Sequence, residues 1–74
     1  MKVYPTYILR DSASVKGAEI VAESIEQAAD FVTEKFTGPV VKGGLLQVGD
    51  DEGNWTVISA ASLIKVVFTV VEEN

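Results

Sequence analysis

The residue types that carry most protein chemistry at neutral pH are scarce in this chain. It has neither histidine nor cysteine, so the commonest general base and the best nucleophile are both missing. A serine needs a neighbouring base to become a nucleophile, and the sequence suggests none beside the serines at positions 12, 14, 24, 59 and 62. Catalysis by paired carboxylates would need a pocket that 74 residues can hardly enclose. We therefore predict a protein that is not an enzyme and uses no cofactor.

One run of acidic residues invites a metal-binding interpretation. Asp50, Asp51 and Glu52 stand directly before Gly53. A calcium loop of the EF-hand type needs oxygen ligands at alternating positions, a glycine at position six and a glutamate at position twelve. Here the acids are consecutive, and position twelve counted from Asp50 is Ala61. The spacing favours a solvated turn, and we predict no metal site.

A second group of acids is regularly spaced. Glu26, Asp30 and Glu34 follow one another at four-residue intervals, which places them on one face of a helix. Together with Glu19 and Glu23 they could form a continuous negative surface that docks a basic partner protein. The alternative is a helix exterior that only keeps the protein soluble. The partner-binding candidates on this side are Glu23, Glu26, Asp30 and Glu34.

The overall charge argues against a nucleic-acid partner. The chain has 11 acidic and 6 basic residues, a formal net charge of −5. Nucleic-acid affinity draws on clustered lysines and arginines, whereas here they stand singly, as Lys2, Arg10, Lys16, Lys35, Lys42 and Lys65. We predict no direct nucleic-acid binding.

No segment has the pattern of a membrane span or a signal peptide. The most apolar stretch, residues 58–71, is interrupted by Ser59, Ser62, Lys65 and Thr69 and is too short to cross a bilayer. The N-terminus lacks a long apolar core followed by a small-residue cleavage site. We expect a cytoplasmic protein without membrane contact.

The element that positions the spaced acids is a well-defined helix. Ser24 followed by Gln27 fits a capping box, in which the serine hydroxyl accepts from the N3 amide and the glutamine reaches back. A helical apolar stripe follows, formed by Ile25, Ala28, Ala29, Val32 and Phe36. Lys35 suits the negative end of the helix dipole, and Gly38 with Pro39 ends the helix. We expect Val32 and Phe36 to be buried against a sheet.

The rest of the chain has the composition of strands and turns. Strands are predicted at residues 2–10, 18–23, 40–49, 55–60 and 65–72. A polar loop at 11–17, a turn at 50–54 and an irregular crossing at 61–64 connect them. Pro5 lacks an N–H, so it should lie at a strand start or on an edge. The whole chain, residues 1–74, is thus expected to form a single α+β domain, a mostly antiparallel five-stranded sheet with one helix on one face, in the order β-β-α-β-β-β.

Apolar residues fall on both faces of two predicted strands. In the last strand, Ile64, Val66, Phe68 and Val70 can face the helix, and Val67 and Val71 then point the opposite way. In the first strand, Tyr4 and Ile8 oppose Tyr7 and Leu9. One helix covers one face of a sheet, so a partner protein or a second copy could cover the other. The alternative is that single exposed valines need no cover. Val67 and Val71 are the partner-binding candidates of this face.

Residues 7–10 (YILR) and 17–28 (GAEIVAESIEQA) resemble the first half of small phage-encoded proteins, among them certain anti-CRISPR inhibitors. Those proteins similarly open with two strands and a helix introduced by Ala-Glu-Ser. The resemblance covers about half of the chain and transfers no functional residue. It implies a stoichiometric, non-enzymatic inhibitor that binds a host protein complex, and an acidic surface would suit an inhibitor that fills a nucleic-acid channel.

These observations predict a non-enzymatic protein-binding module. The resemblance further implies a phage or mobile-element inhibitor that acts by stoichiometric binding to a host protein complex. The alternative is a structural protein that self-associates into a homo-oligomer through its apolar strand faces. The mass in solution distinguishes the two, because a monomer at every concentration favours the binding module.

Overall fold

The only α-helix among the described residues begins where the sequence places its cap. In the computed structural model, which describes residues 1–37 and 44–71, α1 spans Ile25–Thr37. Gln27 N donates to Ser24 Oγ at 3.1 Å, and Glu23 N donates to Gln27 Oε1 at 2.7 Å. The serine half of the capping box is therefore confirmed. The glutamine side chain also reaches back, but it accepts from the backbone N–H of Glu23, one residue before the Ser24 cap. Gly38 and Pro39, expected to end the helix, lie outside the described residues.

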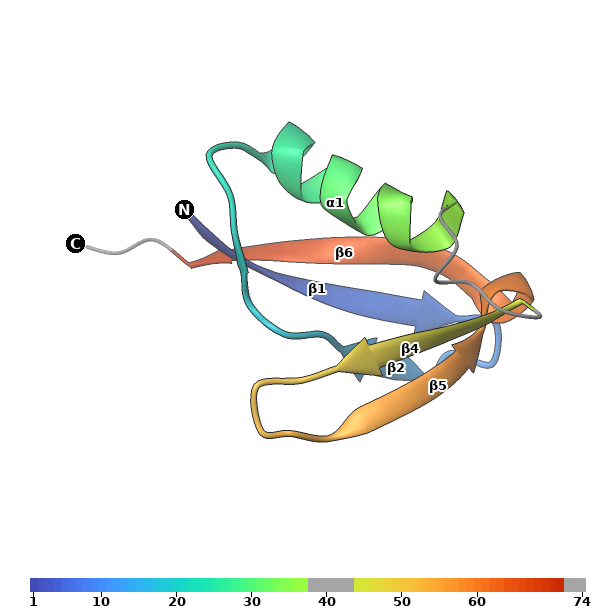
Figure 1. The fold of residues 1–74 in the computed structure, drawn as a ribbon. Coiled ribbons are helices and arrows are strands. Elements are labelled where there is room, and N and C mark those ends of the chain that lie inside the picture. Colours follow the sequence, from blue (N-terminus) through green and yellow to red (C-terminus); the bar gives the residue numbers. More distant parts are fainter. Residues whose placement is uncertain (38–43, 72–74) are drawn as a thin grey trace.

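The middle part of the apolar stripe of α1 packs into the core. Val32 is buried, as predicted; Ala28 of the same stripe is also buried, and Ala29 is half-buried. Ile25 is exposed. It belongs to the first turn of the helix, which lies above β6 in the view of Figure 1. The side chain of Phe36 lies outside the described residues, and its burial stays a prediction.

The larger sheet is organised around β1 (Lys2–Leu9). On one edge β1 pairs antiparallel with β2 (Ser14–Lys16) and β3 (Ile20–Val21), and on the other edge with β6 (Leu63–Val71). Pro5 lies in the middle of this central strand, so its predicted edge position is wrong. The missing N–H is tolerated because position 5 falls between β2 and β3, where Gly17 N donates to Pro5 O at 2.8 Å.

Part of the predicted loop at 11–17 is a strand. Asp11 Oδ1 accepts from Ala13 N at 3.0 Å, and Leu9 N donates to Ala13 O at 2.9 Å. Ser12 takes a positive φ of 69°, and this tight turn brings β2 back beside β1. The strand predicted at 18–23 is in contrast only two residues long, β3, because it pairs with the first residues of β1 alone.

The second half of the chain forms a hairpin of its own. β4 (Leu45–Gly49) and β5 (Trp55–Ser59) pair antiparallel from Leu45↔Ser59 to Gly49↔Trp55. The predicted turn at 50–54 joins them, with Gly53 at a positive φ of 87°. The first residues of the strand predicted at 40–49 lie outside the described residues, and β4 begins at Leu45.

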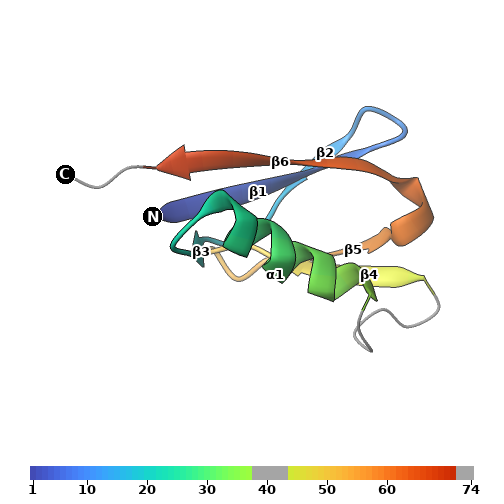
Figure 2. The same cartoon turned by 90° about the horizontal axis from the view of Figure 1, so that it is seen from above.

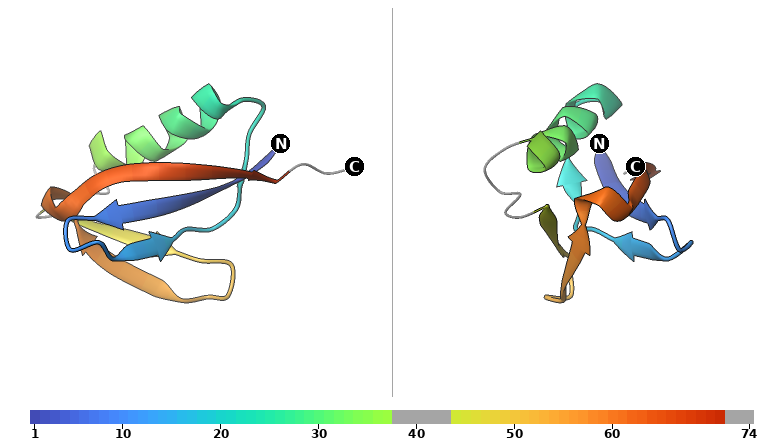
Figure 3. Two further views of the ribbon diagram at one scale, coloured as in Figure 1. Left: turned by 180° about the vertical axis from the view of Figure 1, so that it is seen from behind. Right: turned by 90° about the vertical axis from the view of Figure 1, so that its right-hand side faces the viewer.

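The α+β class is confirmed, but the single five-stranded sheet is wrong: the described residues form six strands in two sheets. The reason lies at the corner η1 (Ala60–Ser62), a short 3₁₀ turn between β5 and β6. Ala60 N donates to Gly44 O at 2.7 Å, and Arg10 N donates to Ser62 O at 2.8 Å. The corner is thus bonded to both sheets, and it turns the hairpin onto one face of the larger sheet (Figure 3).

Helix α1 and the β4–β5 hairpin cover the same face of the larger sheet (Figure 2). This inner face carries Val3, Pro5 and Tyr7 of β1, all buried. The core joins all three parts and consists of Val3, Tyr7, Ile20, Ala22, Ala28, Val32, Leu46, Val48 and Ile58. The opposite, outer face of the sheet is covered by no helix or strand among the described residues.

Candidate functional site

Strand β6 presents apolar side chains to both faces of the sheet. Residues opposite each other in an antiparallel pair project to the same side. Val66 is opposite Tyr7 and Phe68 is opposite Pro5, so both lie on the inner face. The candidates Val67 and Val71 lie on the outer face, as predicted, and are 43% and 41% exposed.

Ile64 does not face the helix as expected. The register between β1 and β6 shifts at Ile8/Leu9, so that Ile8 is opposite Lys65 and Leu9 is opposite Leu63. Ile64 therefore has no opposite residue, and its side chain is exposed.

The outer face also gathers lysines that are far apart in the sequence. Lys16 is opposite Thr6 on β1, and Lys65 is opposite Ile8. Tyr4, Thr6, Lys16 and Thr69 line a shallow hollow of about 270 Å³ on this face. The alternation of β1 and β6 could have placed Lys2 and Lys65 there, whereas Lys16 depends on a strand that the sequence did not predict.

Glu19 belongs to the outer face and not to the acidic helix surface. Tyr4 Oη donates to Glu19 Oε2 at 3.1 Å, and Lys2 Nζ lies 3.8 Å from Glu19 Oε1. The hydrogen bond to Glu19 raises the pKa of the Tyr4 phenol, since loss of its proton would place two negative charges side by side. The expected continuous surface from Glu19 to the helix acids is therefore not formed.

The remaining acids lie at the start of α1 and along its solvent side. Glu26, Asp30 and Glu34, which we call the acidic stripe, are exposed, and so is Glu23. No ion pair involves these four carboxylates among the described residues. The stripe is thus a uniformly negative surface, as the four-residue spacing predicts.

A groove separates α1 from β6. We call it the α1–β6 groove; it has a volume of about 230 Å³ and is lined by Ala29, Val32 and Thr33 of the helix and Leu63, Val66 and Phe68 of the strand. Its helix wall consists partly of the small residues Ala29 and Thr33, one turn apart. Sequence reasoning missed this groove, because it depends on how far the helix stands from the strand.

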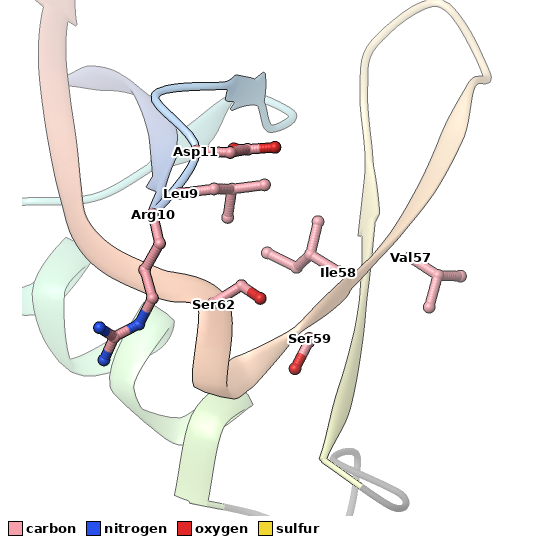
Figure 4. Close-up of a pocket in the computed structure, with 7 residues that line it drawn as sticks. All are labelled: Leu9, Arg10, Asp11, Val57, Ile58, Ser59 and Ser62. Atoms are coloured by element: carbon pink, nitrogen blue, oxygen red, sulfur yellow. The ribbon is translucent and has the colours of Figure 1, made fainter.

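A more polar pocket of about 300 Å³ lies beside the corner, between β5 and the β1–β2 turn (Figure 4). Leu9 and Ile58 point toward each other across it, while the side chains of Arg10 and Asp11 extend in different directions. Arg10 Nε donates to Ala61 O at 3.0 Å. Ser59 and Ser62 complete the lining of this pocket.

The acids of the 50–54 turn stabilise the turn itself. Asp50 Oδ1 accepts from Glu52 N and Asn54 N, each at 2.9 Å, and Asp50 Oδ2 accepts from Asn54 Nδ2 at 3.2 Å. These hydrogen bonds, led by the one from the Asn54 backbone, lower the pKa of Asp50. Asp51 Oδ1 accepts from Glu19 N at 3.2 Å. Within the described part of the chain, no three such side chains come together in a way that would hold a metal ion.

The hairpin has an exposed apolar strip of its own. Trp55 is 72% exposed, and Val57 and Leu45 are also exposed on the side away from the core. The Trp55 ring lies over Gly49, where a Cβ atom would come within 2.9 Å of it. Sequence reasoning did not single out these residues, although their alternation with buried Leu46 and Ile58 indicates their outward direction.

In residues 1–37 and 44–71, no helix is long and apolar enough to cross a membrane. No protein-family model, curated protein or solved structure matches this chain.

Proposed function

We propose that the protein is a non-enzymatic protein-binding module that acts by stoichiometric binding to a partner protein, with β6 as its contact element. The observation that carries this proposal is the apolar exposure of one strand. β6 is nine residues long and exposes four large apolar side chains, Ile64, Val67, Val70 and Val71.

The surroundings of β6 suit a protein interface. Long apolar edge strands are usually blunted or covered in proteins, because they readily pair with other chains. Protein interfaces combine an apolar centre with a polar rim, and here lysines lie on the outer face and the acidic stripe on the helix. The resemblance to phage-encoded inhibitors supports a target in a host protein complex.

Site-specific photocrosslinking tests the proposal. A photoreactive residue in place of Val67 should give one discrete adduct in cells, and the same residue in place of Glu52, at the tip of the hairpin, should not. The crosslinked protein, once identified and purified, should bind in a one-to-one ratio. Val67→Lys should then weaken binding about tenfold, since a buried valine is replaced by a charge. Equal adducts from both positions, or no loss on substitution, would contradict the proposal.

Self-association through the outer face is the second candidate. It is favoured because Val67 and Val71 both project from the outer face, which no described element covers. Sedimentation equilibrium over a range of concentrations separates the two functions. A mass that rises with concentration, and that Val67→Lys or Val71→Lys returns to the monomer, would place the homo-oligomer first.

A further inference from the structure

We propose that the α1–β6 groove binds an extended segment of a partner protein, which adds to β6 as a further strand of the sheet. The segment would carry apolar side chains at every second position and Lys or Arg beside them. This inference rests on the proposed function and names the kind of partner segment that β6 recognises.

The open edge of β6 supplies hydrogen bonds for such a segment. β6 pairs with β1 through eight residue pairs, and no other strand in the described chain pairs with it. Its far edge therefore presents a row of backbone N–H and C=O groups. The residues of β6 do little to block it, because Lys65 is its only charged residue and it contains no proline. At the other edge of the sheet, β2 and β3 are three and two residues long, so β6 is the better template.

The groove supplies a place for the side chains that point inward from an added strand. Such side chains leave the strand on the same face as Val66 and Phe68 and would meet α1 at Ala29 and Thr33. The volume of about 230 Å³ suffices for an aliphatic or aromatic side chain, since an apolar cavity of about 150 Å³ already accepts benzene. Main-chain hydrogen bonds with pockets for alternate side chains are the general basis of strand addition.

The acidic stripe determines the charge of the segment. On a helix, residues three and four apart are neighbours, so Glu26 adjoins Ala29 and Asp30 adjoins Thr33. The carboxylates of the stripe thus run beside the row of small residues that lines the groove, and all of them are exposed. A basic side chain next to the apolar anchor would meet them.

A second copy of this chain fits the groove less well than a basic segment does. Two β6 strands paired edge to edge would bring both helices to the same face of the joined sheet, next to the interface. Their acidic stripes would then approach each other, and like charges brought together across an interface oppose binding. The charge of the helix therefore favours a basic partner.

Binding of a defined peptide tests the inference. The probe is a short fluorescent peptide that alternates leucine with lysine, and its affinity is measured by anisotropy. Thr33→Phe, which fills the groove, should weaken binding about tenfold, the equivalent of one lost apolar contact. Thr56→Phe, the same change at an exposed position of the hairpin, should leave the affinity for the peptide unchanged. Glu26→Gln should weaken binding, and Glu52→Gln in the turn should not.

Two further controls separate strand addition from plain charge attraction. Methylation of alternate peptide backbone nitrogens should abolish binding while the charge stays the same, and amide exchange in β6 should slow when the unmodified peptide is bound. Unchanged binding by the methylated peptide, or by Thr33→Phe, would overturn the inference. So would a dimer whose β6 amides are protected without any peptide.

The inference and the proposed function fail in different ways. If the partner crosslinked from Val67 binds Thr33→Phe normally and leaves β6 amide exchange unchanged, the groove is not its site, while stoichiometric binding still holds. If the peptide binds as described and no partner crosslinks from Val67, the groove recognises extended segments and the proposed interface is wrong.

Discussion

The two faces of the larger sheet are made of alternate residues of the same strands, yet they differ in every property that matters for function. The inner face of β1 carries Val3, Pro5 and Tyr7, all buried beneath α1 and the hairpin. The outer face carries Tyr4, Thr6 and lysines, and no described element covers it. In β6 the same alternation places Phe68 inside and Val67 outside.

This difference separates stability from recognition at the scale of single residues. Removal of a side chain from the inner face leaves a cavity in the core, where the larger sheet, α1 and the hairpin meet. Removal of the neighbouring side chain from the outer face removes contacts at the surface of the sheet only. Substitutions at adjacent positions should therefore have very different consequences. Each prediction below compares the covered and the uncovered parts of the molecule.

Tyr7→Ala should have the largest effect. Tyr7 is 0% exposed, and truncation of a large buried aromatic residue costs about 3–5 kcal/mol. For a domain of this size that is most of its stability. Urea titrations should therefore show that the variant is already largely unfolded at low urea concentration. Tyr4→Ala, on the outer face, should cost far less, because it removes one hydrogen bond at the surface and no core packing. Equal losses would mean that the two faces do not differ as described.

Gly17→Ala should destabilise the protein by about 1–3 kcal/mol, the usual cost of overpacking. A Cβ atom at Gly17 would lie 2.9 Å from Pro5 Cγ and 3.1 Å from Tyr7 Cε2. Both side chains are held in the core, so neither can move away cheaply. Thermal melts measure the loss. Gly53→Ala is the contrasting change, because no atom lies within 4 Å there and its cost arises from the positive φ alone.

Ser24→Ala should cost about 1 kcal/mol, the usual value for a lost N-cap oxygen. The Ser24 hydroxyl is exposed and accepts from Gln27 N, so the loss concerns the cap and not the core. A lower melting temperature with unchanged folding cooperativity is the expected result. An unchanged melting temperature would show that the helix does not depend on this cap.

The parts of the fold that were predicted correctly depend on local patterns. The cap at Ser24 and the buried pair Ala28 and Val32 follow from spacing within one helix. The alternation of β6 likewise predicts that Val67 and Val71 share the outer face. Such features need only neighbouring residues, and a sequence shows those directly.

The missed parts depend on contacts between distant residues. β2 has only one residue with a strong strand preference, Val15, and it forms because a tight turn returns it to β1. The separate hairpin sheet depends on the corner, where Arg10 bonds Ala61 across 51 positions. The α1–β6 groove requires the distance between a helix and a strand, which no periodicity contains. Lys16 reaches the outer face for the same long-range reason.

Asp50→Ala should have a smaller effect that depends on pH. The carboxylate accepts hydrogen bonds from Asn54 and Glu52, which hold the folded-state pKa of Asp50 below its ordinary value. A depressed carboxyl pKa stabilises the fold above the unfolded-state value, and this contribution is lost as the pH falls through the folded-state pKa. The wild type should therefore exceed the variant in stability at neutral pH, and the difference should shrink in acid. A difference that is constant with pH would contradict the role assigned to the carboxylate.

Val67→Lys should change the stability of the monomer least, by about 0.5 kcal/mol or less, as is usual for surface substitutions. The outer face already carries Lys65 and Lys16, and the new lysine can extend into water along its aliphatic stem. Val66→Lys, one residue earlier, would place a charge on the inner face opposite Tyr7 and should cost several times more. Urea titrations of both variants at two protein concentrations decide the matter. If Val67→Lys destabilises the protein strongly at high concentration and hardly at low concentration, the outer face is buried in a homo-oligomer. If the loss is small at both, Val67 is left uncovered in the monomer, as a surface that awaits a partner must be.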